Sequence, residues 1–180
     1  MNNIKPEKLF FIKNQNKYIK LNKKKKKVNN ISAVILPHPG IKYGAQISNK
    51  IYEKINFTNY DKILILATHH NLGTFISEST KFVYDKTTFN FNYNGLTKII
   101  KDDNKFNEEH SWLIHLPYLK KVKKTDNITI ILVGENYTND IFIEIKNIIN
   151  PKTLLIVNTD LMHCGRDFNI TCPFNHHEIN

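Results

Sequence analysis

Histidine residues follow three of the four most apolar stretches of the sequence: His38, the pair His69 and His70, and His163. Neutral imidazole is a common ligand for iron, copper and zinc, so a group of histidines can form a metal site. Asp160 lies three residues before His163 and could orient a ligand or act as an acid or base in catalysis. A single histidine after a strand is more often an ordinary loop residue, but three such placements in 180 residues favour one shared pocket.

The four apolar stretches are rich in Ile, Leu and Val and predict strands that are buried on both faces, at residues 32–36, 62–67, 128–133 and 153–157. The spacing of apolar residues predicts helices at 45–55, 95–100, 106–122 and 140–149. This alternation is typical of an α/β fold with a mostly parallel central sheet flanked by helices.

Parallel strands have their carboxyl ends at the same edge of the sheet, where the ligand sites of open α/β sheets lie. We therefore expect His38, His69 and His163 to converge on one pocket at that edge. Neighbouring residues of an extended segment face opposite ways, so His70 is expected to point elsewhere.

The formal net charge is +10, and Arg166 is the single arginine among 26 basic residues. Recognition of bases and phosphates favours the planar arginine side chain, so nucleic acid is not the expected partner. The run from Lys23 to Lys27 is predicted to be an exposed linker. The sequence shows neither an apolar run of membrane-spanning length nor a signal peptide, and two cysteines are too few for a disulfide scaffold. We therefore expect a cytoplasmic protein that does not have a membrane as a partner.

Five segments, in order along the chain, resemble sequence motifs of the Memo family. They are Pro37-His38-Pro39-Gly40, Thr68-His69-His70, Glu109-His110-Ser111 followed by Leu116-Pro117, Ile130-Ile131-Leu132-Val133-Gly134, and the segment from Asn158 to Gly165. Each segment alone is weakly specific, but five at compatible spacing are jointly specific.

The resemblance implies the fold of the class III extradiol dioxygenases, which use non-haem iron. It implies that His38 and His69 are metal ligands, with iron or copper as the metal, and that His163 and Asp160 lie in the same pocket as catalytic residues. Memo proteins have a further cysteine ligand much later in the chain, where the dioxygenases have a glutamate. This chain is expected to end before that position, so ring-cleaving dioxygenase activity is expected to be absent.

Residues 1–30 are predicted to be a basic N-terminal segment, residues 31–166 a Memo-like α/β domain, and residues 167–180 a polar tail. The first functional hypothesis is a metal-binding protein with redox activity. Its alternatives are a non-enzymatic signalling protein that binds phosphotyrosine-containing peptides or a small molecule at the same pocket, and an inactive, truncated homologue. Whether the protein is an enzyme is left open.

Overall fold

The computed structural model describes residues 14–22 and 24–159. Its strands are β1 (Ala33–Pro37), β2 (Lys62–Leu72), β3 (Thr74–Ile76), β4 (Lys81–Tyr84), β5 (Thr87–Asn90), β6 (Ile100–Lys101), β7 (Ile128–Glu135) and β8 (Thr153–Thr159). Its helices are α2 (Ile41–Lys54), α3 (Asp103–Glu108), α4 (Leu116–Lys121) and α5 (Asn139–Asn147), with short 3-10 helices η1 (Asn16–Tyr18), η2 (Phe57–Asn59) and η3 (Leu113–His115).

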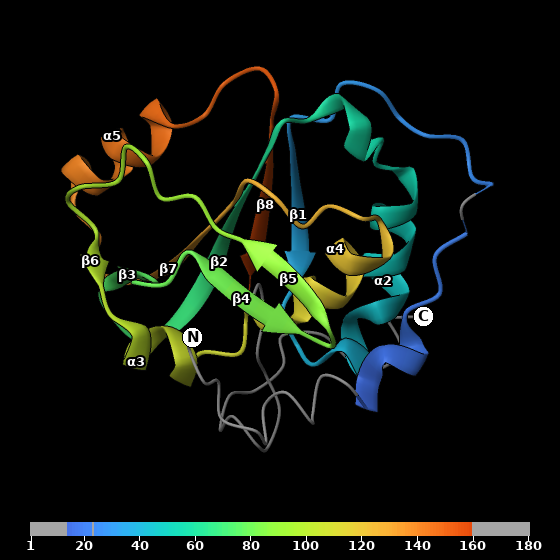
Figure 1. The fold of residues 1–180 in the computed structure, drawn as a ribbon, viewed down its shortest axis with the longest axis horizontal. Coiled ribbons are helices and arrows are strands. Elements are labelled where there is room, and N and C mark those ends of the chain that lie inside the picture. Colours follow the sequence, from blue (N-terminus) through green and yellow to red (C-terminus); the bar gives the residue numbers. More distant parts are fainter. Residues whose placement is uncertain (1–13, 23, 160–180) are drawn as a thin grey trace, which may run out of the picture.

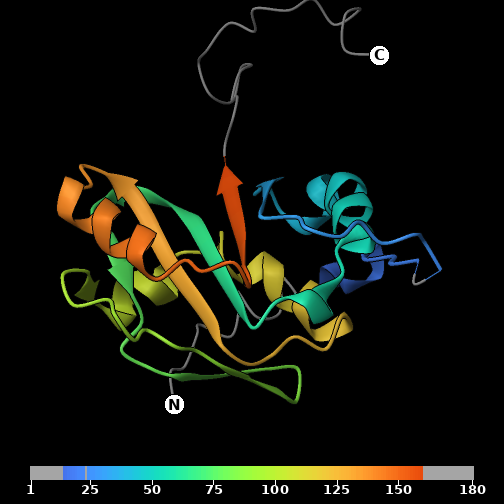
Figure 2. The same cartoon turned by 90° about the horizontal axis from the view of Figure 1, so that it is seen from above.

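Six of the strands form one sheet in the spatial order β1-β8-β2-β7-β3-β6 (Figure 1). The four long strands β1, β8, β2 and β7 are mutually parallel, and only β3 runs antiparallel to its neighbour β7. Helices α2 and α4 lie on one side of the central strands and α5 lies on the other, as the two views in Figure 1 and Figure 2 show. The predicted α/β fold with a mostly parallel sheet flanked by helices is confirmed.

The centre of the sheet is buried on both faces. Ile63, Leu64 and Ile65 of β2 are fully buried, which explains why this strand is a continuous apolar run instead of an alternating pattern. Among the helices of the described ranges, none is long and apolar enough to cross a membrane.

Two of the expected helices differ in the structure. Residues 95–100 form a turn and the start of β6, because Gly95 has a φ of 86°, a conformation that a helix does not contain. The single helix predicted at 106–122 is divided into the end of α3, η3 and α4, and Pro117 lies in the first turn of α4, where its missing N–H costs no hydrogen bond.

Strand β2 contains a bulge near its carboxyl end. Thr68 pairs with Val133 and Leu72 with Glu135, so three residues of β2 lie opposite one residue of β7, Gly134. A Cβ atom at Gly134 would lie 2.1 Å from the Asn71 carbonyl oxygen, so only glycine fits beneath the bulge. His69 and His70 are within this bulge.

The chain from residue 14 to residue 28 lies along α2, and we call its described part the strap. Gln15 accepts a hydrogen bond from the backbone N–H of Lys42 at the start of α2, and the backbone N–H of Asn22 donates to Glu53 near its end. Ile19 of the strap is buried in the core. The strap therefore packs on the α/β domain, although the predicted domain boundaries themselves stay a prediction.

The lysine run belongs to the strap. Lys24, Lys25 and Lys26 are exposed as predicted, whereas Lys27 is half-buried and its Nζ donates to the Glu53 carbonyl at 2.8 Å. Lys23 lies outside the described residues.

Candidate metal centre

Three histidines from separate segments come together near the carboxyl ends of β1 and β2. His38 follows β1 and is buried, His70 lies in the bulge of β2, and His110 precedes η3. The Nε2 atoms of His38 and His70 lie 3.1 Å apart, and the His70 and His110 rings stack with centroids separated by 5.2 Å. One ligand atom from each of the three residues lies within 4.8 Å of the other two. We call this group the histidine cluster.

The Glu109 carboxylate connects two segments of the cluster through hydrogen bonds. Its Oε2 accepts hydrogen bonds from the backbone N–H of His70 at 3.1 Å and from the His70 Nδ1 at 2.8 Å, while its Oε1 accepts from the backbone N–H groups of His110 and Ser111. Burial raises the pKa of Glu109, but the hydrogen bonds from His70 and from these backbone groups outweigh burial and lower the pKa to about 2. Glu109 is therefore an ionised acceptor at neutral pH.

The bond to Glu109 fixes which nitrogen of His70 carries a proton. An ionised carboxylate only accepts hydrogen bonds, so neutral His70 has its proton on Nδ1 and a lone pair on Nε2. A histidine whose second nitrogen donates to a carboxylate is the common arrangement of metal-ligating imidazoles. The lone pair of His70 thus faces His38, where an ion would lie.

The spacing of one pair of nitrogens in the cluster is close to that of two ligands on a transition-metal ion. Two imidazole nitrogens bound tetrahedrally at about 2.0–2.1 Å lie roughly 3.3–3.4 Å from one another. The separation of 3.1 Å between His38 and His70 is close to that value. The side chains of His70 and His110 are 42% and 44% exposed, so the cluster is open to solvent on one side.

His69 is not part of the cluster. Its ring is buried, its Nδ1 lies 3.3 Å from the Gly73 carbonyl oxygen, and it packs edge-on against Phe75. The expectation that His70 points away from His38 is wrong. Adjacent residues do face opposite ways, but it is His70, and not His69, that faces His38. The assignment of His69 as a metal ligand stays a prediction.

A buried polar network lies next to the cluster and joins the segments that carry it. The Asn158 Nδ2 donates to the Ser111 carbonyl at 2.7 Å and to the His115 Nε2 at 3.0 Å. His115 Nε2 is therefore an acceptor, and its protonated Nδ1 donates to the Tyr52 hydroxyl at 3.0 Å. The Ser111 hydroxyl donates to the Thr68 carbonyl, which ties the Glu109–Ser111 segment to β2. His110 and His115 thus have different surroundings.

Two residues predicted for the site, Asp160 and His163, lie outside the described residues, so the expected convergence of His163 with His38 stays a prediction.

Comparison with known proteins identifies the family. The sequence model of the Memo-like proteins matches residues 8–179, nearly the whole chain. The chain belongs to the Memo-like family. A search of curated proteins finds no sequence that matches it.

His70, His110 and Glu109 of this Memo-like protein are not among the site residues predicted from its sequence. The motif Glu109-His110-Ser111 did carry a signal, because it is one of the five segments that resemble the family. What the motif alone does not reveal is that β2 and the Glu109–Ser111 segment meet, and that contact makes the carboxylate a partner of His70.

Proposed function

We propose that this Memo-like protein binds a transition-metal ion, iron or copper, through His38, His70 and His110. The observation that carries the proposal is the pair of Nε2 atoms 3.1 Å apart, one of them on a histidine whose Nδ1 donates to Glu109. Imidazole ligands suit both metals.

The same residues support a redox function. A bound iron or copper ion would supply one-electron chemistry and positions for small molecules on the side where His70 and His110 are exposed. His38 would hold the ion from the buried side, and Glu109 would keep the His70 ring oriented. Glu109 already accepts four hydrogen bonds, which makes it a positioning residue instead of a carboxylate ligand.

The experiment is metal titration of the chelator-treated protein with ferrous iron and with cupric copper, followed by calorimetry and elemental analysis. We expect one ion per chain. His38→Ala, His70→Ala and His110→Ala should each weaken binding at least tenfold, whereas His69→Ala should retain it. Loss of binding in His69→Ala, with retention in His70→Ala and His110→Ala, would overturn this ligand set and restore the one predicted from the sequence.

The second candidate is peptide binding at the same cluster. It is supported by the partial exposure of His70 and His110 and by the net charge of +10, which would favour an anionic peptide. A phosphotyrosine-containing peptide that binds the chelator-treated protein, with an unphosphorylated peptide as control, would favour this candidate over metal chemistry.

A further inference from the structure

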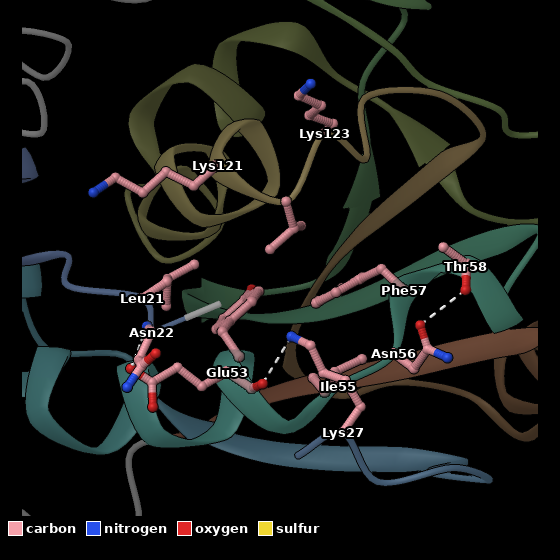
Figure 3. Close-up of a pocket in the computed structure, with 12 residues that line it drawn as sticks. Leu21, Asn22, Lys27, Glu53, Ile55, Asn56, Phe57, Thr58, Lys121 and Lys123 are labelled. Atoms are coloured by element: carbon pink, nitrogen blue, oxygen red, sulfur yellow. Dashed lines mark hydrogen bonds between the residues drawn. The ribbon is translucent and has the colours of Figure 1, made fainter. Parts of the chain in front are cut away.

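The two sides of the sheet are covered unequally. On the side of α2 and α4 the strap adds a further layer, and Figure 3 shows Lys27 of the strap beside Ile55, with its ammonium group bound to the Glu53 carbonyl. On the other side α5 lies over β7 and β2, away from β1 (Figure 1, Figure 2). The part of the chain that the structure describes therefore leaves this side of β8 and β1 open.

A row of apolar side chains crosses the open surface. Ile35 of β1 pairs with Val157 of β8, which in turn pairs with Leu66 of β2. Side chains paired in parallel register point to the same face of a sheet, and Leu66 lies in a groove beneath α5. Ile35 is largely exposed, and Val157 and Leu66 are half-buried. We call this surface of β8 and β1 the open strip.

Helix α5 carries more apolar side chains than its contact with the sheet uses. Ile141 and Ile145 pack against the core. Phe142 and Ile143 are instead 59% and 52% exposed, and Ile149, just after the helix, is 41% exposed. A helix that is apolar around most of its circumference is usually buried on more than one side. The outer face of α5 therefore has the character of a contact surface.

A groove joins this helix to the sheet beside the open strip. Its volume is about 390 Å³, and its lining includes Phe142 and Ile149 from the α5 segment and Leu66 and Leu155 from the sheet. The one charged residue among the lining residues is Lys146. Single exposed apolar residues are normal on a protein surface, but a continuous apolar surface usually marks an interaction site. The groove and the open strip together form such a surface.

The open strip is about one helix wide. Neighbouring strands lie about 4.8 Å apart, so two strands span about 10 Å, close to the diameter of a helix with its side chains. An apolar helix therefore has the shape that would cover the strip. The outer face of α5 from a second copy is such a helix. Because α5 borders the strip of its own copy and can cover that of the other, the contact would close with two-fold symmetry.

We propose that two copies of this chain associate through α5, β8 and β1. Phe142 and Ile143 of each copy would lie against Ile35 and Val157 of the other. The net charge of +10 on each copy opposes the association, so the apolar contact must outweigh that repulsion. The inference does not rest on the proposed metal function, because none of the three histidines of the cluster lines the groove.

Sedimentation velocity over a range of micromolar chain concentrations tests the proposal. We expect a monomer–dimer equilibrium, and Ile143→Asp should raise its dissociation constant at least tenfold. Ile47→Asp is the matched control, because Ile47 is 53% exposed on α2, on the other side of the sheet. It should change the dissociation constant less than twofold. Added sodium chloride should strengthen the dimer, because it screens the repulsion between two copies of like charge.

A second measurement locates the contact. NMR amide shifts that change on dilution should appear at Ile35, Val157 and Phe142. Phe142→Ala, which introduces no charge, should also weaken the dimer, with circular dichroism showing that the variants are folded. Shifts at Ile47 instead would place the contact on α2 and would overturn the proposal, as would equal dissociation constants for Ile143→Asp and Ile47→Asp. A chain that stays monomeric at every concentration would also overturn it, and would mean that another segment or a different protein covers the open strip.

Discussion

Glu109 accepts two hydrogen bonds from His70, one from its backbone N–H at 3.1 Å and one from its ring at 2.8 Å. The same carboxylate therefore fixes both the position of the chain and the orientation of the imidazole. We regard this contact as the feature that selects His70, and not its neighbour His69, for the histidine cluster.

Replacing Glu109 by Gln should weaken metal binding about 10–100-fold, the usual effect of losing a carboxylate that orients a metal-ligating histidine. The amide cannot accept with both terminal atoms, so it loses either the bond from His70 or those from His110 and Ser111. Calorimetric titration with ferrous iron measures the effect. Glu108→Gln is the matched control, because Glu108 is exposed on the neighbouring position of the chain. Equal affinities of the two variants would contradict the role of Glu109.

Gly134→Ala should destabilise the protein by more than about 3 kcal/mol, since the new methyl group would meet backbone and not a movable side chain. Metal affinity should fall as well, because the bulge that carries His70 must shift. Gly44→Ala in α2 is the control. Its Cβ would have ordinary contacts at 3.6 Å, and we expect it to stabilise the helix by about 0.5–1 kcal/mol. Urea denaturation measures both variants. A Gly134→Ala protein as stable as the unmodified one would show that the bulge is not tightly packed.

His115 should make the protein less stable as the pH falls. Burial, assisted by the nearby His38, lowers the pKa of His115 from 6.5 to about 3 in the folded state. Between these values the unfolded chain binds a proton that the folded protein does not, so stability is complete above about pH 6.5 and is lost on acidification. The contribution is at most about 1.4 kcal/mol per pH unit.

Denaturant unfolding of the chelator-treated protein at several pH values between about 6 and 4 tests this, with His115→Gln as the comparison. The variant should have a lower free energy of unfolding at neutral pH, but this free energy should fall less steeply as the pH is lowered. Parallel pH profiles of the two proteins would mean that His115 is protonated in the folded state.

Replacing Lys24, Lys25 and Lys26 by Ser should leave the thermal midpoint nearly unchanged, because all three side chains are exposed. Lys27→Ser should cost about 0.5–1.5 kcal/mol, because it removes the hydrogen bond to the Glu53 carbonyl. Differential scanning calorimetry distinguishes the two. A large loss in the triple variant would show that the exposed lysines have partners in the fold.

Ring-cleaving dioxygenase activity should be absent. That reaction uses iron held by two histidines and one carboxylate, whereas the described cluster offers three histidines, with Glu109 bound to His70. The protein loaded anaerobically with ferrous iron and then given oxygen and a catechol should form no yellow ring-opened product. Turnover that is lost in His70→Ala would contradict this expectation and would make Asp160 the carboxylate to test next.

The strands and the place of His38 could be predicted from the sequence, because each long strand is a continuous apolar run and His38 follows the first of them. The expected burial of both faces is wrong for β1, because this strand lies at the edge of the described sheet and its Ile35 is 61% exposed. The sequence could not predict which of His69 and His70 faces His38. A two-residue period predicts that neighbours face opposite ways but not which one faces the site, and the bulge changes the relation between β2 and β7. Gly134 can be recognised as the glycine opposite the bulge only after the structure shows that the Asn71 carbonyl oxygen occupies the place of its missing side chain.

The order of strands in the sheet also has a consequence for how the protein is made. Among the described strands β1 pairs with β8 alone, and β8 is the last of them along the chain. At about 5–20 residues per second, roughly 6–25 s separate the synthesis of Pro37 from that of Thr159. During this interval the nascent chain carries an apolar strand without its sheet neighbour, a candidate segment for chaperones at the ribosome. His38 is attached to that strand, so the proposed metal site can form only after translation of nearly all the described chain.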